Sequence, residues 1–155
     1  MKATKPLLVV GAGIAGITSA LEAAEAGAEV VLVERDSTVG GHFGPELKFA
    51  GVDLIVFEDI SPTPVLLCIE DDRVELRDAA PYWGLGTMDA EKALKGDLGE
   101  DFEVACIGPA GENGVSFACI GHDFGRQAGR CGIGAVMGSK RLTAIAVRGS
   151  GSVPI

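Results

Sequence analysis

The feature that most constrains this chain is a glycine-dense segment with a basic end, residues 108–148. Five basic residues and no acidic one fall between residues 126 and 155, whereas the other 125 residues hold 8 basic and 22 acidic side chains. Glycine lets backbone N–H groups approach a ligand closely, and Arg126 and Arg130 can each present a planar pair of donors to phosphate oxygens. The glycines at the basic end are Gly129, Gly132, Gly134 and Gly138. The segment fits an anion-binding site and a solvated surface loop about equally well.

Composition places the chain among globular proteins of one domain, or of one domain and a fragment. It has 155 residues, 47% of them hydrophobic, which is enough for a core. The net charge of −9 argues against nucleic acid or an anionic membrane as a partner. The four cysteines show no C-x-x-C spacing, so we expect free thiols in a cytoplasmic protein and no local zinc or iron–sulfur site.

The first 42 residues have the pattern of a dinucleotide-binding unit. An apolar strand over 6–10 precedes a G-x-G-x-x-G turn, a helix to about residue 26 and a strand over 29–34. In such a unit the pyrophosphate lies on the helix N-terminus and an acidic residue accepts from a ribose hydroxyl. The candidate FAD-site residues are Gly11, Gly13, Gly16, Glu34, Gly40 and Gly41. Glycines and acidic residues in and after residues 7–21 argue against a secretory signal or a membrane span.

Two families are resembled in succession. The stretch VVGAGIAGITSALEAAEAGAEVVLVERDSTVGGH is similar to the FAD-binding start of the heterodisulfide reductase A subunit. From about residue 43 onward, FGPELKFAGVDLIVFED, PVLLCIEDDRVELRDA, WGLGTMDAEKALK and the glycine-rich block resemble the N-terminal domain of tungsten-dependent aldehyde:ferredoxin oxidoreductases. We therefore expect an α/β chain: a Rossmann-like βαβ unit over 1–42, then a β-rich α+β portion of an oxidoreductase base domain over 43–155.

The second resemblance implies a cofactor and a site. In that family the domain is a base beneath tungsten or molybdenum held by two pterins, and the Arg-x-x-Gly-Arg-x-Gly segment lies against the pterin phosphates. The residues implied here are Arg126, Gln127, Gly129, Arg130, Gly132 and Gly134. Cys131 departs from the glycine often found at its position.

The function implied is that of an oxidoreductase component. Family chemistry oxidises an aldehyde to a carboxylate and passes electrons to ferredoxin through an iron–sulfur cluster. The helical domains that carry that chemistry are missing from this sequence, so we expect no turnover by the chain alone and expect other oxidoreductase subunits or ferredoxin as partners. A homo-oligomer, an FAD- or NAD-binding electron-transfer module and a truncated inactive fusion remain open alternatives.

The rest of the chain is predicted to alternate short strands with two helices. His42 and His122 are each interpreted as solitary loop residues, and Glu112-Asn113 either as a cap beneath the cofactor or as an ordinary turn. A helix over 88–98 is expected with Thr87 as its N-cap, and a short helix near Ile133. Strands are expected at 52–57, 65–69, 74–76, 103–107, 115–120 and 142–147, with a β-hairpin over 64–78.

Overall fold

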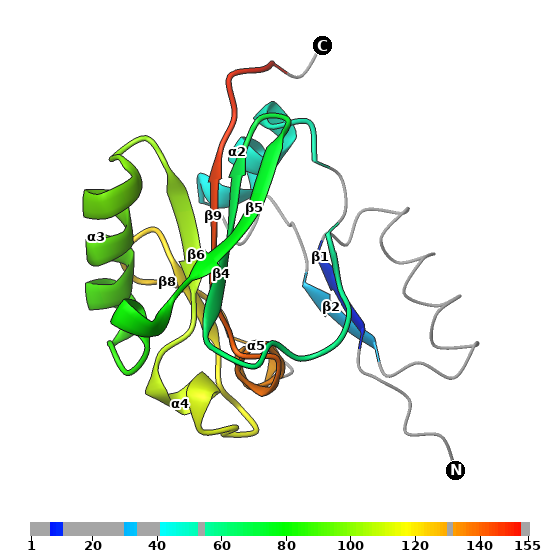
Figure 1. Cartoon of the computed structure of the whole chain (residues 1–155), viewed down its shortest axis with the longest axis vertical. Helices are drawn as coiled ribbons and strands as arrows, with labels where there is room; N and C mark the ends of the chain where they lie inside the picture. The colour runs from blue at the N-terminus through cyan, green and yellow to red at the C-terminus, as the bar shows by residue number, and fades with distance from the viewer. Residues whose placement is uncertain (1–6, 11–29, 34–40, 53–54, 130–131, 153–155) are drawn as a thin grey trace.

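The structure is a computed structural model that describes residues 7–10, 30–33, 41–52, 55–129 and 132–152. Its centre is a six-stranded sheet in the order β5-β4-β9-β6-β7-β8, in which only the β4–β9 pair is parallel (Figure 1). The strands are β4 (Val65–Glu70), β5 (Arg73–Asp78), β6 (Glu103–Cys106), β7 (Ile120–His122), β8 (Arg126–Ala128) and β9 (Leu142–Arg148).

The central strands are buried on both faces, which explains their nearly continuous apolar sequences. In β4, Leu67 and Ile69 belong to one core cluster, while Leu66 and Cys68 belong to the other. The same alternation runs along β9, where every residue except Arg148 is buried. The sheet therefore carries a hydrophobic core on each side.

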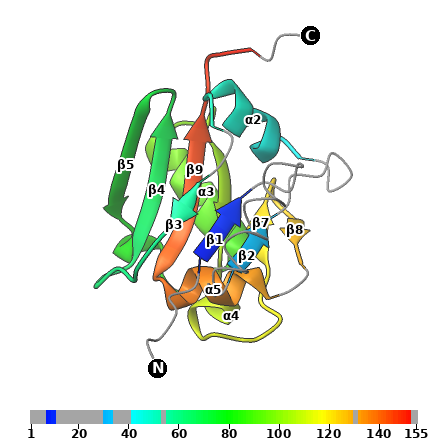
Figure 2. The ribbon, with the colours of Figure 1, turned by 90° about the vertical axis from the view of Figure 1, so that its right-hand side faces the viewer.

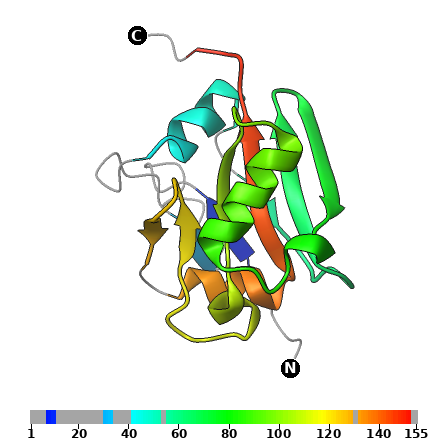
Figure 3. The same cartoon turned by 90° about the vertical axis from the view of Figure 1, so that its left-hand side faces the viewer.

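One face is covered by α3 (Thr87–Leu98), as Figure 3 shows. Its apolar stripe of Ala90 and Leu94 packs on small side chains of the sheet, including Ala144 and Ala146, which let the helix approach closely. The short η1 helix (Ala80–Tyr82) precedes it.

The opposite face is covered by two helices and by the front of the chain. Leu47 of α2 (Phe43–Phe49) and Met137 of α5 (Ile133–Ser139) lie in the same core cluster. The short α4 helix (Pro109–Glu112) packs beside α5. Figure 2 shows α2, α5 and the front strands on this side of the sheet.

A second sheet of three strands forms the front of the chain. Its order is β2-β1-β3, from β2 (Val30–Val33), β1 (Leu7–Val10) and β3 (Val56–Phe57). The β1–β2 pair is parallel, as a βαβ unit requires, but β3 pairs antiparallel on the other side of β1. An open dinucleotide-binding sheet continues there with a parallel strand, so the Rossmann-like start is not confirmed.

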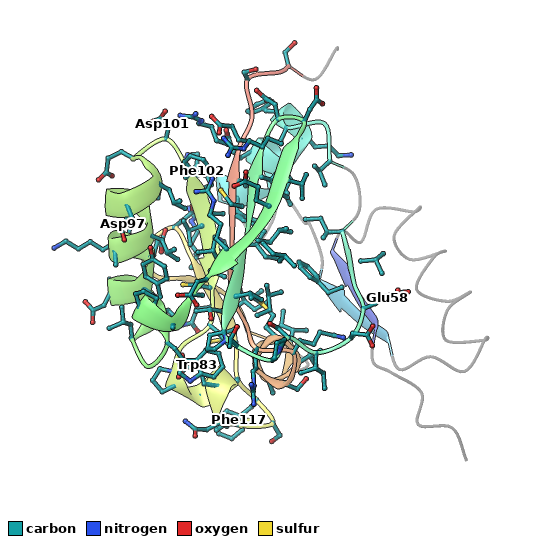
Figure 4. All side chains as sticks on the ribbon, viewed as in Figure 1. Glu58, Trp83, Asp97, Asp101, Phe102 and Phe117 are labelled. Carbon is teal, nitrogen blue, oxygen red and sulfur yellow. The ribbon has the colours of Figure 1, made fainter. Side chains whose placement is uncertain are left out.

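An ion-pair group closes the end of the sheet away from α4. The Arg148 guanidinium pairs with Glu70, lies 3.1 Å from Asp101 Oδ2, and sits over the Phe102 ring at 5.0 Å. In Figure 4, Asp101 and Phe102 lie at this end of the molecule, whereas Trp83 and Phe117 lie at the α4 end.

Most of the predicted elements are confirmed and two are corrected. The hairpin over 64–78, the strands near 103–107 and 142–147 and the helix near Ile133 are present, and α3 begins at Thr87 with Gly86 as its N-cap. The strand predicted over 115–120 is wrong: Ala118 N–H donates to the Val115 carbonyl in a turn, and pairing begins at Ile120. The strand predicted over 52–57 is reduced in the described residues to Val56–Phe57, and α2 was not predicted.

Candidate anion-binding site

The basic segment begins on β8, the edge strand of the large sheet. Arg126 and Gln127 are both exposed there, because β8 pairs only with β7. The Arg126 Nε lies 3.7 Å from Asp123 Oδ2, and the Gln127 Oε1 accepts from the Cys119 thiol at 3.2 Å. Gly129 is exposed, with open space where a Cβ would stand. Arg130 and Cys131 lie outside the described residues.

The two following glycines of the predicted site are buried against protein backbone. A Cβ on Gly132 would stand 2.0 Å from the Ser116 carbonyl oxygen, and its φ of +67° is left-handed, where a side chain is strained. A Cβ on Gly134 would stand 2.4 Å from the Cys119 carbonyl oxygen. These glycines let the start of α5 pack on the 116–119 turn, and their contact with a ligand stays a prediction.

Asp123 gathers groups that the sequence keeps apart. Its Oδ2 accepts the His42 backbone N–H at 2.9 Å and lies 3.4 Å from His122 Nδ1. Its Oδ1 lies 3.8 Å from the ring Nδ1 of His42. The interpretation of His42 and His122 as solitary loop residues was therefore wrong. No spacing signal could reveal this contact, because residues 42 and 123 are 81 positions apart.

Two buried carboxyls beneath α3 adjoin Asp123. Glu91 is 1% exposed, and burial raises the pKa of its carboxyl while the Phe124 N–H, which it accepts at 2.9 Å, opposes the rise. Burial also raises the pKa of Glu103, with Lys95 opposing and Asp123 reinforcing the shift. The Lys95 Nζ lies 3.4 Å from Glu103 Oε1. A sequence signal existed for these groups, since Glu91 and Lys95 form an i,i+4 pair immediately beside the apolar stripe of Ala90 and Leu94.

The thiols and the acidic groups do not form a metal site in the described part of the chain. Cys68, Cys106 and Cys119 are free, as predicted, and no group of three histidine, cysteine or acidic residues there could hold a metal ion. Burial raises the pKa of Cys106 to about 12, and its Sγ contacts the Thr87 carbonyl oxygen at 3.3 Å. Cys106 is therefore an inert core thiol.

The GPAGEN turn caps backbone rather than projecting reactive groups. Glu112 Oε1 accepts the Gly84 N–H at 2.8 Å, and Asn113 Nδ2 donates to the Pro109 carbonyl at 2.7 Å. The two residues fix α4 against the turn that precedes α3, and their place beneath a cofactor stays a prediction.

Of the predicted FAD residues, only Gly41 falls in the described part of the chain. A Cβ on Gly41 would stand 2.1 Å from Asp123 Oδ2, so its lack of a side chain serves packing against the rear of the molecule. Gly11, Gly13, Gly16, Glu34 and Gly40 lie outside the described residues.

The chain was compared with known families. A family profile described as "Aldehyde ferredoxin oxidoreductase, N-terminal domain" matches residues 8–149. This chain belongs to that family. Among its relatives, the tungsten-containing aldehyde ferredoxin oxidoreductase of Thermococcus kodakarensis is 56% identical over 117 residues, which are 75% of this chain and 19% of that protein. The aldehyde ferredoxin oxidoreductase domain found here thus spans about one fifth of the relative's length.

A solved structure and a second relative complete the comparison. The active site complex BamBC of benzoyl coenzyme A reductase, in complex with 1,5-dienoyl-CoA, matches with a TM-score of 0.69 and 46% identity over 72% of this chain and 17% of that chain. The heterodisulfide reductase A chain of Methanosarcina mazei, which works with ferredoxin and CoB-CoM, is 55% identical over 40 residues, 26% of this chain and 5% of that protein. Within the described residues, no helix is long and apolar enough to cross a membrane.

Proposed function

We propose that this chain is a base-domain component of an aldehyde ferredoxin oxidoreductase-type enzyme, and that it binds pterin phosphates through the β8 strand and the glycine-rich turn after it. The observation that carries the proposal is the exposed Arg126 on an edge strand, followed by the open Gly129, in a chain of this family. A guanidinium at a free edge can approach a phosphate without displacing protein.

The residues present fit a phosphate-bearing group. Arg126 supplies charge and donors, Gln127 an amide, and Gly129 room for close backbone approach. Gly132 and Gly134 would contribute by holding the turn against residues 116–119. The part assigned to Arg130 rests on the family resemblance. When bound, a tungsten or molybdenum pterin would supply two-electron redox chemistry.

Catalysis is assigned to the assembly and not to this chain. The chain spans 19% of the Thermococcus relative, and its buried carboxyls Glu91 and Glu103 lie under α3, away from solvent. A complete reaction, aldehyde to carboxylate with electrons passed to ferredoxin, needs further oxidoreductase subunits that carry an iron–sulfur cluster. We place this assembly in the cytoplasm.

A second candidate function is an FAD-binding electron-transfer module. It is favoured by the parallel β1–β2 pair and by the 40-residue similarity to the heterodisulfide reductase of Methanosarcina mazei. The antiparallel β3 on the other side of β1 and the packing of Gly41 on Asp123 count against it. An inactive fusion is the third possibility, and it would bind neither group.

Cofactor content separates these functions. The protein is produced in cells supplied with tungstate and molybdate, purified without oxygen, and assayed for metal, pterin and flavin. We expect retained pterin, less of it in Arg126→Ala, no flavin absorbance and no aldehyde oxidation. Flavin without pterin would support the module instead, and neither cofactor would support the inactive fusion.

A further inference from the structure

The carboxylate of Asp123 lies between two segments that are far apart in the sequence. On one side its Oδ2 accepts the backbone N–H of His42, and on the other side it faces the Nε of Arg126 at 3.7 Å. The Asp123 side chain is only 9% exposed, while that of Arg126 is 54% exposed. A buried anion thus holds the base of a guanidinium whose outer part reaches solvent.

The approach of the front segment to Asp123 depends on Gly41. A Cβ at this position would stand 2.1 Å from Asp123 Oδ2 and 3.0–3.1 Å from two atoms of the His122 ring. Real Cβ atoms do not come so close to other heavy atoms, so any other residue at position 41 would push the carboxylate away. Gly41 therefore fixes where the carboxylate stands.

The turn that carries Asp123 is held in a demanding conformation. Asp123 and Phe124 have φ of 46° and 50°, as in the type I′ turns that match the twist of a hairpin. The Gly125 N–H donates to the His122 carbonyl at 3.3 Å, and Phe124 N–H donates to the buried Glu91. Positive φ in a bulky residue persists only where the surroundings impose it, and such sites concentrate where geometry matters for function. Here the imposed turn directly precedes Arg126.

We propose that Asp123 is a positioning residue for the phosphate site: it orients the Arg126 guanidinium and, through Gly41 and His42, ties that orientation to the segment entering α2. The inference rests on the proposed function, since it needs Arg126 to bind an anion. Asp123 itself does not touch the ligand.

The sign of one substitution distinguishes positioning from simple electrostatics. A carboxylate beside an anion site repels the anion, so a bystander replaced by a neutral isostere would leave pyrophosphate binding tighter. If Asp123 positions Arg126, Asp123→Asn weakens binding although a repulsive charge is gone. The amide oxygen of asparagine can still accept the His42 N–H, so the fold is kept.

The test is calorimetric titration of inorganic pyrophosphate into wild type, Asp123→Asn, Arg126→Ala and the double variant. We expect Asp123→Asn to weaken binding about two- to fivefold, the range of an exposed ion pair. In the Arg126→Ala background the same change should weaken binding no further, because the group that it positions is gone. A melting temperature near that of wild type shows that the loss is not unfolding.

A second variant moves the carboxylate while keeping its charge. Gly41→Ala should also weaken pyrophosphate binding, whereas Gly96→Ala, an exposed position on α3 with open space around it, should leave the affinity unchanged. Unchanged or tighter binding in folded Asp123→Asn or Gly41→Ala protein overturns the inference and leaves the proposed function standing. Unchanged binding in Arg126→Ala rejects the proposed function, and the positioning role of Asp123 with it.

Discussion

At the scale of single residues, the glycines of the glycine-rich block divide into two kinds that their spacing does not distinguish. Gly129 is exposed and has open space around it, whereas Gly138 is buried where a Cβ would stand 1.9 Å from the Gly111 carbonyl oxygen. The first leaves room for a ligand, and the second lets α5 pack directly on α4. Equal residue types thus serve binding and packing within one short segment.

We expect Gly138→Ala to destabilise the protein by at least about 2 kcal/mol, because overpacking against rigid backbone forces the two helices apart. Gly96→Ala is the matched control: it lies in α3 with nothing within 4 Å, and alanine should stabilise the helix by roughly 0.5–1 kcal/mol. Urea unfolding of both variants measures the difference. A Gly138→Ala protein as stable as wild type would show that α4 and α5 do not touch as described.

At the scale of elements, α3 carries a buried acid that gives the fold a pH dependence. Burial raises the folded pKa of Glu91 above its ordinary value of 4.5, so the folded protein binds the proton more tightly than the unfolded chain does. The free energy of unfolding from this group is therefore highest below pH 4.5 and falls as the pH rises through the folded pKa. Glu103 acts in the same direction.

Glu91→Gln should remove this contribution. The difference in free energy of unfolding, variant minus wild type, is expected to become more positive as the pH rises from about 4 to about 8, by about 1.4 kcal/mol for each unit of pKa shift. Glutamine keeps an oxygen to accept the Phe124 N–H. Urea denaturation at a series of pH values measures the difference, and parallel curves for the two proteins would mean that Glu91 titrates as it does in the unfolded chain.

The elements show where sequence reasoning works in this chain. The β4–β5 hairpin was predictable because two apolar runs flank Asp71-Asp72, and Asp71 takes the left-handed turn conformation that aspartate tolerates. The turn at 115–118 was mistaken for strand because its apolar residues are buried by the approach of Gly132, which is a tertiary contact. The α2 helix was missed because Gly44 and Pro45 resemble a turn, although proline is tolerated in the first turn of a helix.

At the scale of the whole molecule, the sequence predicted the family and the basic edge but not the group behind it. Motif spacing pointed to Arg126 and Gly129, since the family resemblance covers consecutive residues. Asp123 was missed because its partners His42 and Glu91 come from separate elements, and only the packing of α2, α3 and the β7–β8 turn brings them together.

The four cysteines should all be free thiols throughout the molecule. Cys68, Cys106 and Cys119 are free in the described structure, and Cys131 is predicted to be free from its sequence spacing. Thiol counting on denatured, non-reduced protein should find four, whereas the native protein should react slowly at Cys106, where burial raises the pKa to about 12. A count of two would reveal a disulfide involving Cys131 or formed on purification.

The affinity of a phosphorylated pterin for Arg126→Ala, compared with Arg73→Ala, tests the central claim most directly. Both arginines lie on edge strands, at opposite ends of the same sheet, and each faces a carboxylate. If β8 binds the phosphates, Arg126→Ala should weaken binding about tenfold, since a charge-assisted hydrogen bond contributes roughly 1.5–3 kcal/mol, while Arg73→Ala leaves the affinity unchanged. Equal affinities in wild type, Arg126→Ala and Arg73→Ala would contradict the pterin-phosphate site.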